Sequence, residues 1–154
     1  MAVETEKRTE SPYKTFEVKP QLLASGKKVT MLAKTDILSC GVQVVASGGE
    51  TNLHAHNAQD AIWLVLGGKA RFYGPGDAVV AELGKNQALL IPRGEPYWFE
   101  SASEENLVIL RIAATDKNTP DTRNDVGARQ FAVPGAEGGA QREVVVLDKR
   151  FGDD

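Results

Sequence analysis

The sequence predicts an all-β sandwich or barrel, and two observations support this fold class. Short apolar or alternating runs recur from residue 29 to residue 147, a spacing typical of folds built from many short strands. Turn sequences separate the runs: SGGE, LGGK, YGPGD, LGKN and PRGEP. These turns offer glycine for positive φ and proline for fixed φ. Helix signals are weak throughout.

The runs place the expected strands. We expect strands at residues 29–33, 37–46, 61–66, 69–73, 78–83, 88–92, 97–101, 107–113, 130–133 and 143–147. The run at 61–66 is bounded by Asp60 and by Gly67 and Gly68, and it is too short for a typical helix. Residues 116–139 are mostly polar, so we expect them to form a long surface connection.

The length and the N-terminal composition predict the domain organisation. A chain of 154 residues matches one domain. Residues 1–20 are polar and charged and are expected to form a flexible arm, with 21–154 as a single β-barrel domain. Such an arm is able to form a strand against another subunit, and a small barrel with sheet edges favours a homodimer.

Charge and cysteine content exclude several classes of partner. The net charge is −3, from 18 basic and 21 acidic residues, so we expect neither nucleic-acid nor membrane binding. There is no secretory leader pattern and no 18-residue apolar stretch, which predicts a cytoplasmic protein. The single cysteine, Cys40, excludes an internal disulfide and fits a buried core position.

The two histidines of the chain stand together. His54 and His56 are separated by one residue, so in a strand both side chains point to one face with Cα atoms about 6.5 Å apart. With Asp60 they make the ligand set of a facial triad, which favours Fe(II), while Mn, Zn, Ni and Cu also accept these donors. The alternative is a chance pair on an exposed strand. Gln59 is a rival ligand that ranks behind Asp60, because alternation places the two on opposite faces.

The spacing around the histidines resembles the first motif of the cupin superfamily. That motif reads Gly, five residues, His-x-His, three or four residues, Glu, six residues, Gly. Gly48, His54, His56, Asp60 and Gly67 fit it, with Asp in place of Glu.

The stretch NQALLIPRGEPYWFES resembles the second cupin motif, which reads Gly, five residues, Pro-x-Gly, two residues, His, three residues, Asn. Pro92 and Gly94 match, whereas Asn86, Tyr97 and Ser101 replace the Gly, His and Asn. This sequence also resembles bacterial cupins of unassigned function. The resemblance covers residues 43–113 and implies a double-stranded β-helix, or jelly-roll, cupin barrel that holds a divalent transition metal and often forms a homodimer.

The departures and the basic residues give further candidates. Tyr97, at the position of the lost histidine, is the candidate catalytic residue: it would ligate the metal, hydrogen-bond a substrate or move a proton, or else simply fill the lumen with Phe99. Phe99, Arg71 and Arg111 are the candidate substrate-binding residues, since an arginine near the lumen can anchor a carboxylate. The alternative for each arginine is an outward, solvated side chain.

Three functions follow from these candidates. The first is a metal-dependent enzyme acting on a small organic molecule, such as a non-haem Fe(II) dioxygenase. The second is a non-redox isomerase or lyase in which the metal polarises a carbonyl. The third is a non-catalytic barrel that binds a small molecule. Open metal positions favour the enzymes.

Overall fold

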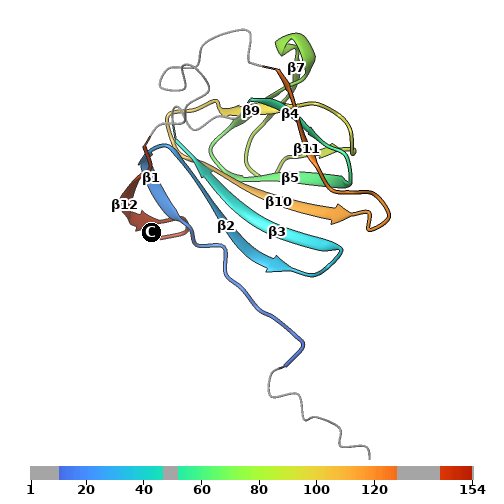
Figure 1. Ribbon diagram of the computed structural model, residues 1–154. Helices are drawn as coiled ribbons and strands as arrows, with labels where there is room; N and C mark the ends of the chain where they lie inside the picture. Colours follow the sequence, from blue (N-terminus) through green and yellow to red (C-terminus); the bar gives the residue numbers. More distant parts are fainter. Residues whose placement is uncertain (1–10, 47–51, 128–142, 154) are drawn as a thin grey trace, which may run out of the picture.

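The computed structural model describes residues 11–46, 52–127 and 143–153 (Figure 1). Twelve strands and one short 3₁₀ helix, η1 (Pro75–Asp77), make up these parts of the chain. The strands are β1 (Gln21–Ser25), β2 (Lys27–Lys34), β3 (Leu38–Val45), β4 (Leu53–His56), β5 (Gln59–Gly67), β6 (Ala70–Tyr73), β7 (Val79–Leu83), β8 (Ala88–Ile91), β9 (Trp98–Ser101), β10 (Leu107–Thr115), β11 (Arg123–Gly127) and β12 (Val145–Arg150).

The strands form two layers that enclose a lumen. One layer is an antiparallel sheet in the order β2-β3-β10-β5-β8. The sheet β7-β6-β9 and the pair β11-β4 make the other layer, and the pair β1-β12 lies beside the large sheet (Figure 1). The arrangement confirms the predicted all-β, double-stranded β-helix barrel.

Side-chain alternation on β5 defines the inner face of the large sheet. Trp63 and Val65 are buried, whereas Ile62 between Ala61 and Trp63 is 45% exposed, so odd-numbered residues of β5 point inward. Pairing carries this phase across the sheet: Trp63 lies opposite Arg111 of β10, and Val65 opposite Ile109, which in turn pairs with Gln43 of β3. Arg111 and Gln43 therefore belong to the inner face.

The lumen is filled at one end by a cluster of buried apolar side chains. Its members are Val45, Trp63, Val65, Ala70, Phe72, Leu83, Ile91, Tyr97, Phe99, Leu107 and Ile109. The aromatic rings of this cluster contact one another, with centroids of Trp63 and Phe99 5.0 Å apart. A cavity opens beside this cluster at the end where β4 and β11 lie.

The chain ends pack on the outer face of the large sheet. Val18 and Phe151 contact a buried cluster that includes Leu23 and Val44, and the Lys19 carbonyl accepts a hydrogen bond from the Arg150 guanidinium at 2.9 Å. Residues 11–20 form no strand, while residues 1–10 of the predicted arm lie outside the described residues. The division into arm and barrel, and the homodimer, stay predictions.

Two strands differ from expectation. β1 was not expected, because its sequence is short and flanked by polar residues. The predicted long connection at 116–139 contains β11, which pairs with β4. Its polar sequence RNDVG gave no strand signal, because β11 is an edge strand whose side chains are exposed. The predicted strand at 130–133 lies outside the described residues. Among the described residues, no helix is long and apolar enough to cross a membrane.

Candidate functional site

His54, His56 and Tyr97 meet at the open end of the lumen. β4 pairs with β11 on one side, and on the other His54 and Tyr97 exchange backbone hydrogen bonds of 3.1 and 2.8 Å. The ring centroids of the two histidines are 5.2 Å apart, and those of His54 and Tyr97 are 4.6 Å apart. The expected convergence of the two imidazoles on one face is therefore present.

Both imidazoles are neutral at neutral pH. Burial lowers the pKa of His54 to about 4, with nearby positive charges adding to the effect. Burial and the charges of Arg111 and Arg123 also lower the pKa of His56. The Nδ1 atom of His54 lies 2.8 Å from the Asn52 carbonyl oxygen, which can only accept, so Nδ1–H donates and Nε2 keeps its lone pair.

Three cationic side chains share a lumen cavity of about 230 Å³ with these rings. Lys27 of β2, Arg111 of β10 and Arg123 of β11 line it. The remaining lining residues are Val29, Gln43, His54, His56, Trp63, Tyr97 and Phe99. Arg111 lies over the Trp63 ring, 5.7 Å from its centroid, and Lys27 lies over the Phe99 ring, 5.6 Å from its centroid. Such cation–π contacts are attractive for a charged side chain. No carboxylate of the described residues lines this cavity.

The partners of the cations leave positive charge in the cavity. Arg123 is partly neutralised by Asp125 at 3.3 Å. Arg111 donates to the Gln59 side-chain oxygen at 2.8 Å, and within the described part of the chain neither Arg111 nor Lys27 forms an ion pair with a carboxylate. Burial, with a contribution from Arg123, lowers the pKa of Lys27 to about 8. At neutral pH most Lys27 side chains are still charged.

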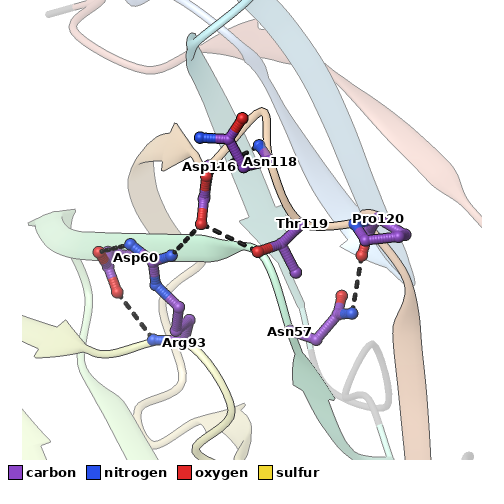
Figure 2. Close-up of polar contacts among 7 residues, drawn as sticks. All are labelled: Asn57, Asp60, Arg93, Asp116, Asn118, Thr119 and Pro120. Carbon is purple, nitrogen blue, oxygen red and sulfur yellow. Dashed lines mark hydrogen bonds and ion pairs between the residues drawn. The ribbon is translucent and has the colours of Figure 1, made fainter.

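Asp60 does not join the histidines. It points to the outer face of β5, where its carboxylate accepts hydrogen bonds from Arg93, which also contacts Asp116 (Figure 2). This placement corrects the expectation that Asp60 completes a facial triad. The physical reason is the phase of β5: Gln59 rather than Asp60 lies on the lumen side, where its amide bridges Arg111 and Asp121.

The glycine that follows β5 explains why the sequence predicted the wrong inward-facing residue on this strand. Gly68, not Gly67, has a positive φ of 73°, and a Cβ there would lie 2.5 Å from the Asn106 carbonyl oxygen. Taking Gly68 as the last residue of the first cupin motif, with the four-residue spacing after His56, puts Ala61 at the carboxylate position. Ala61 is buried and lines a small cavity with His56 and Tyr97, but its methyl group cannot bind a metal.

The other candidates divide between the two faces. Tyr97, Phe99 and Arg111 line the lumen cavity. Arg71 lies on the outer face of β6, paired with Glu82 and, at 3.7 Å, with Glu100, which corrects its assignment as a substrate-binding residue. Alternation on β6 explains this, because its neighbours Ala70 and Phe72 are the buried residues.

The donor set does not fit the divalent metal that the resemblance implied. Within the described residues, no three His, Cys, Asp or Glu side chains come close enough to hold a metal ion. Burial raises the pKa of the Tyr97 phenol, which disfavours the phenolate form. A dication bound by the two imidazoles would be repelled by the three cationic side chains nearby, and there would be no carboxylate ligand to offset that repulsion.

Sequence reasoning missed Lys27, Gln43 and Arg123. Gln43 had a signal, since it is the one amide in the apolar run of β3. Lys27 and Arg123 had none, because one begins a strand after a glycine and the other lies in a polar stretch read as a loop.

The barrel and its lumen site define a small double-stranded β-helix protein. A family model described as a cupin domain matches residues 41–113 of the chain. No curated protein matches the chain.

Solved structures share the fold at low identity. A cupin-like protein from Thermotoga maritima is 24% identical, with a TM-score of 0.57, over 68% of this chain and 79% of that one. A Klebsiella pneumoniae protein with a double-stranded β-helix domain is 15% identical, with a TM-score of 0.56, over 64% and 84%. The Cnp3 cupin domain of Schizosaccharomyces pombe is 21% identical, with a TM-score of 0.55, over 62% and 69%. These likenesses support the fold alone.

Proposed function

We propose that this cupin binds a small organic carboxylate in its lumen without a metal ion. The observation that carries the proposal is the lining of the main lumen cavity, where Lys27, Arg111 and Arg123 converge and no described carboxylate is present. Lys27 and Arg111 are partly withdrawn from solvent and have no carboxylate partner among the described residues that line the cavity, and an anionic ligand would supply one. Arg111 offers the planar donor pair that carboxylates prefer.

The walls define the rest of the ligand. Trp63, Tyr97 and Phe99 line the cavity with aromatic surface, and a cavity of about 230 Å³ admits only a small molecule. We therefore expect a compact carboxylate with an apolar or aromatic body.

The metal-dependent readings are less well supported. A dioxygenase, isomerase or lyase of the expected kind needs the histidines, a carboxylate and a metal, and the carboxylate is directed elsewhere. In the anion-site proposal the same histidines are neutral polar residues of the cavity wall. The binding cupin, rather than the metal-dependent enzyme, is the function that the geometry favours.

Calorimetric titration with phenylacetate and with neutral phenylacetamide tests the proposal. We expect phenylacetate to bind more tightly, to bind equally after chelator treatment, and to lose about tenfold or more in affinity in Arg111→Gln, because a charge-assisted hydrogen bond is lost. Arg111→Lys, which keeps the charge, should lose less. Lys28→Gln is the matched control, since Lys28 lies on the outer face of β2.

Two results would overturn it. One is equal or absent binding of the acid and the amide. The other is near-stoichiometric bound metal in the purified protein that disappears in His54→Ala and on which phenylacetate binding depends, an outcome that would restore the metal-dependent reading.

A further inference from the structure

Gln43 is a buried amide with an unused hydrogen-bond acceptor in the lumen. It lies in the middle of β3, between Val29 of β2 and Ile109 of β10, and its side chain is only 9% exposed. Its Oε1 atom is buried and has no hydrogen-bond partner among the described residues. Buried amide oxygens are almost always paired, so this atom indicates a group that the ligand supplies.

The neighbours of Gln43 do not satisfy it. Lys27 lies over the Phe99 ring and Arg111 over the Trp63 ring, where Arg111 also holds Gln59. These cations provide donors for an anionic group elsewhere in the same cavity. Gln43 lines the same cavity as these cations, and its oxygen has no partner among them.

Donors and acceptors are unequally distributed among the cavity walls. The three cations can only donate, whereas Gln43 Oε1 and the lone pair on His54 Nε2 can only accept. A ligand that matches both kinds of group carries an anion and, close to it, a hydroxyl or N–H donor. A simple carboxylate would match only the cations and leave Gln43 unpaired.

We propose that Gln43 selects ligands that carry a hydroxyl or amino group beside the carboxylate, so that the lumen is a site for small hydroxy- or amino-carboxylates. This inference rests on the proposed function, because it assumes that the carboxylate is held in the lumen. It adds a specificity residue and narrows the ligand class from carboxylates in general to those with a neighbouring donor.

Mandelate and phenylacetate are the matched probes, because they differ by one hydroxyl group beside the carboxylate. We expect the better enantiomer of mandelate to bind the wild-type protein about tenfold more tightly than phenylacetate, the effect of one satisfied buried acceptor. In Gln43→Leu the ratio of the two affinities should fall to about one. Gln43→Met should give the same ratio. Its side chain is unbranched, so it controls for a packing defect that leucine would introduce.

A stability measurement separates recognition from a structural role. Because Gln43 Oε1 has no partner to lose, Gln43→Leu should unfold in urea at the same or a higher midpoint than the wild type. A large drop in the midpoint of both variants would show that the amide serves the fold, and would overturn the inference.

The two proposals fail in different ways. If phenylacetate binds but mandelate binds no better, or if the preference survives in both Gln43 variants, the role of Gln43 is overturned and the carboxylate site stands. If neither acid binds the wild-type protein, the carboxylate site itself is overturned, and with it the role of Gln43.

Discussion

The Asp60 carboxylate is held at both oxygens by Arg93, which donates its backbone N–H at 2.8 Å and its guanidinium at 3.1 Å (Figure 2). The same guanidinium reaches Asp116 at 2.8 Å. These contacts, the backbone hydrogen bond first, lower the pKa of Asp60. The carboxylate at the expected metal-ligand position therefore joins β5 to the loop before β9 and to the end of β10.

Asp60→Asn should leave the lumen site unchanged. We expect phenylacetate affinity within about twofold of wild type, because distant sites without shared partners act independently. Thermal stability should decrease slightly, since these contacts are solvent-exposed. Titration calorimetry and a melting curve check the two parts. Loss of a bound metal in Asp60→Asn, matching its loss in His54→Ala, would contradict the placement of Asp60 outside the site.

Carboxylate binding should weaken as the pH rises through about 8. Lys27, whose pKa is lowered to about 8 by burial and by Arg123, is charged below that pH and neutral above it, while a ligand carboxylate stays ionised throughout. The other charged or titratable groups around the cavity are His54, His56, Tyr97, Arg111 and Arg123. Burial lowers the pKa of both histidines and raises the pKa of Tyr97, so these shifts move their titration away from pH 8. Affinity for phenylacetate, measured from pH 6 to pH 9.5, should be flat at first and then fall by about tenfold.

The matched control lies one residue away. Lys27→Gln should bind weakly with little change between pH 7 and 9, whereas Lys28→Gln removes the same charge from the opposite face of β2 and should keep the wild-type profile. An unaltered decline in Lys27→Gln would assign the titration to another group.

The fold could be predicted from the sequence because its strands alternate strongly and its turns carry glycine and proline. The contents of the lumen were harder to predict. The His54 and His56 pair follows from two-residue periodicity alone, but the choice between Gln59 and Asp60 depends on the phase of β5, which adjacent glycines left open. Arg123 reaches the cavity only through the pairing of β11 with β4, a contact between strands distant in sequence.

His54 should make the protein less stable in mild acid. Its pKa is about 4 in the folded protein and about 6.5 in an unfolded chain. Between these values the unfolded chain takes up a proton that the folded protein does not, so the free energy of unfolding falls as the pH decreases from 6.5 towards 4. At pH 5 the His54 contribution to this loss is about 2 kcal/mol.

His54→Gln isolates this contribution. Carboxylates titrate in the same range in both proteins, so the difference between variant and wild type in urea unfolding at pH 7 and pH 5 reports His54. We expect the variant to lose about 2 kcal/mol less than wild type over this interval. Equal losses would mean that His54 takes up its proton at a similar pH in the folded and unfolded states.

Gly68 should tolerate substitution much less well than Gly67, and the comparison tests the register of the first cupin motif. A Cβ at Gly68 would lie 2.5 Å from the Asn106 carbonyl oxygen at a φ of 73°, and Asn106 is fixed by its side-chain hydrogen bonds to the Leu23 backbone at 2.6 and 2.9 Å. Gly68→Ala should therefore lower the free energy of unfolding by about 2–4 kcal/mol. A Cβ at Gly67 would meet only the ring of Phe151 at 2.9 Å, which can rotate, so Gly67→Ala should cost about 1 kcal/mol. Urea unfolding of both variants measures the difference. The opposite order would make Gly67 the structural glycine and return Asp60 to the carboxylate position, whereas the expected order leaves Ala61 there and the lumen without its metal-binding carboxylate.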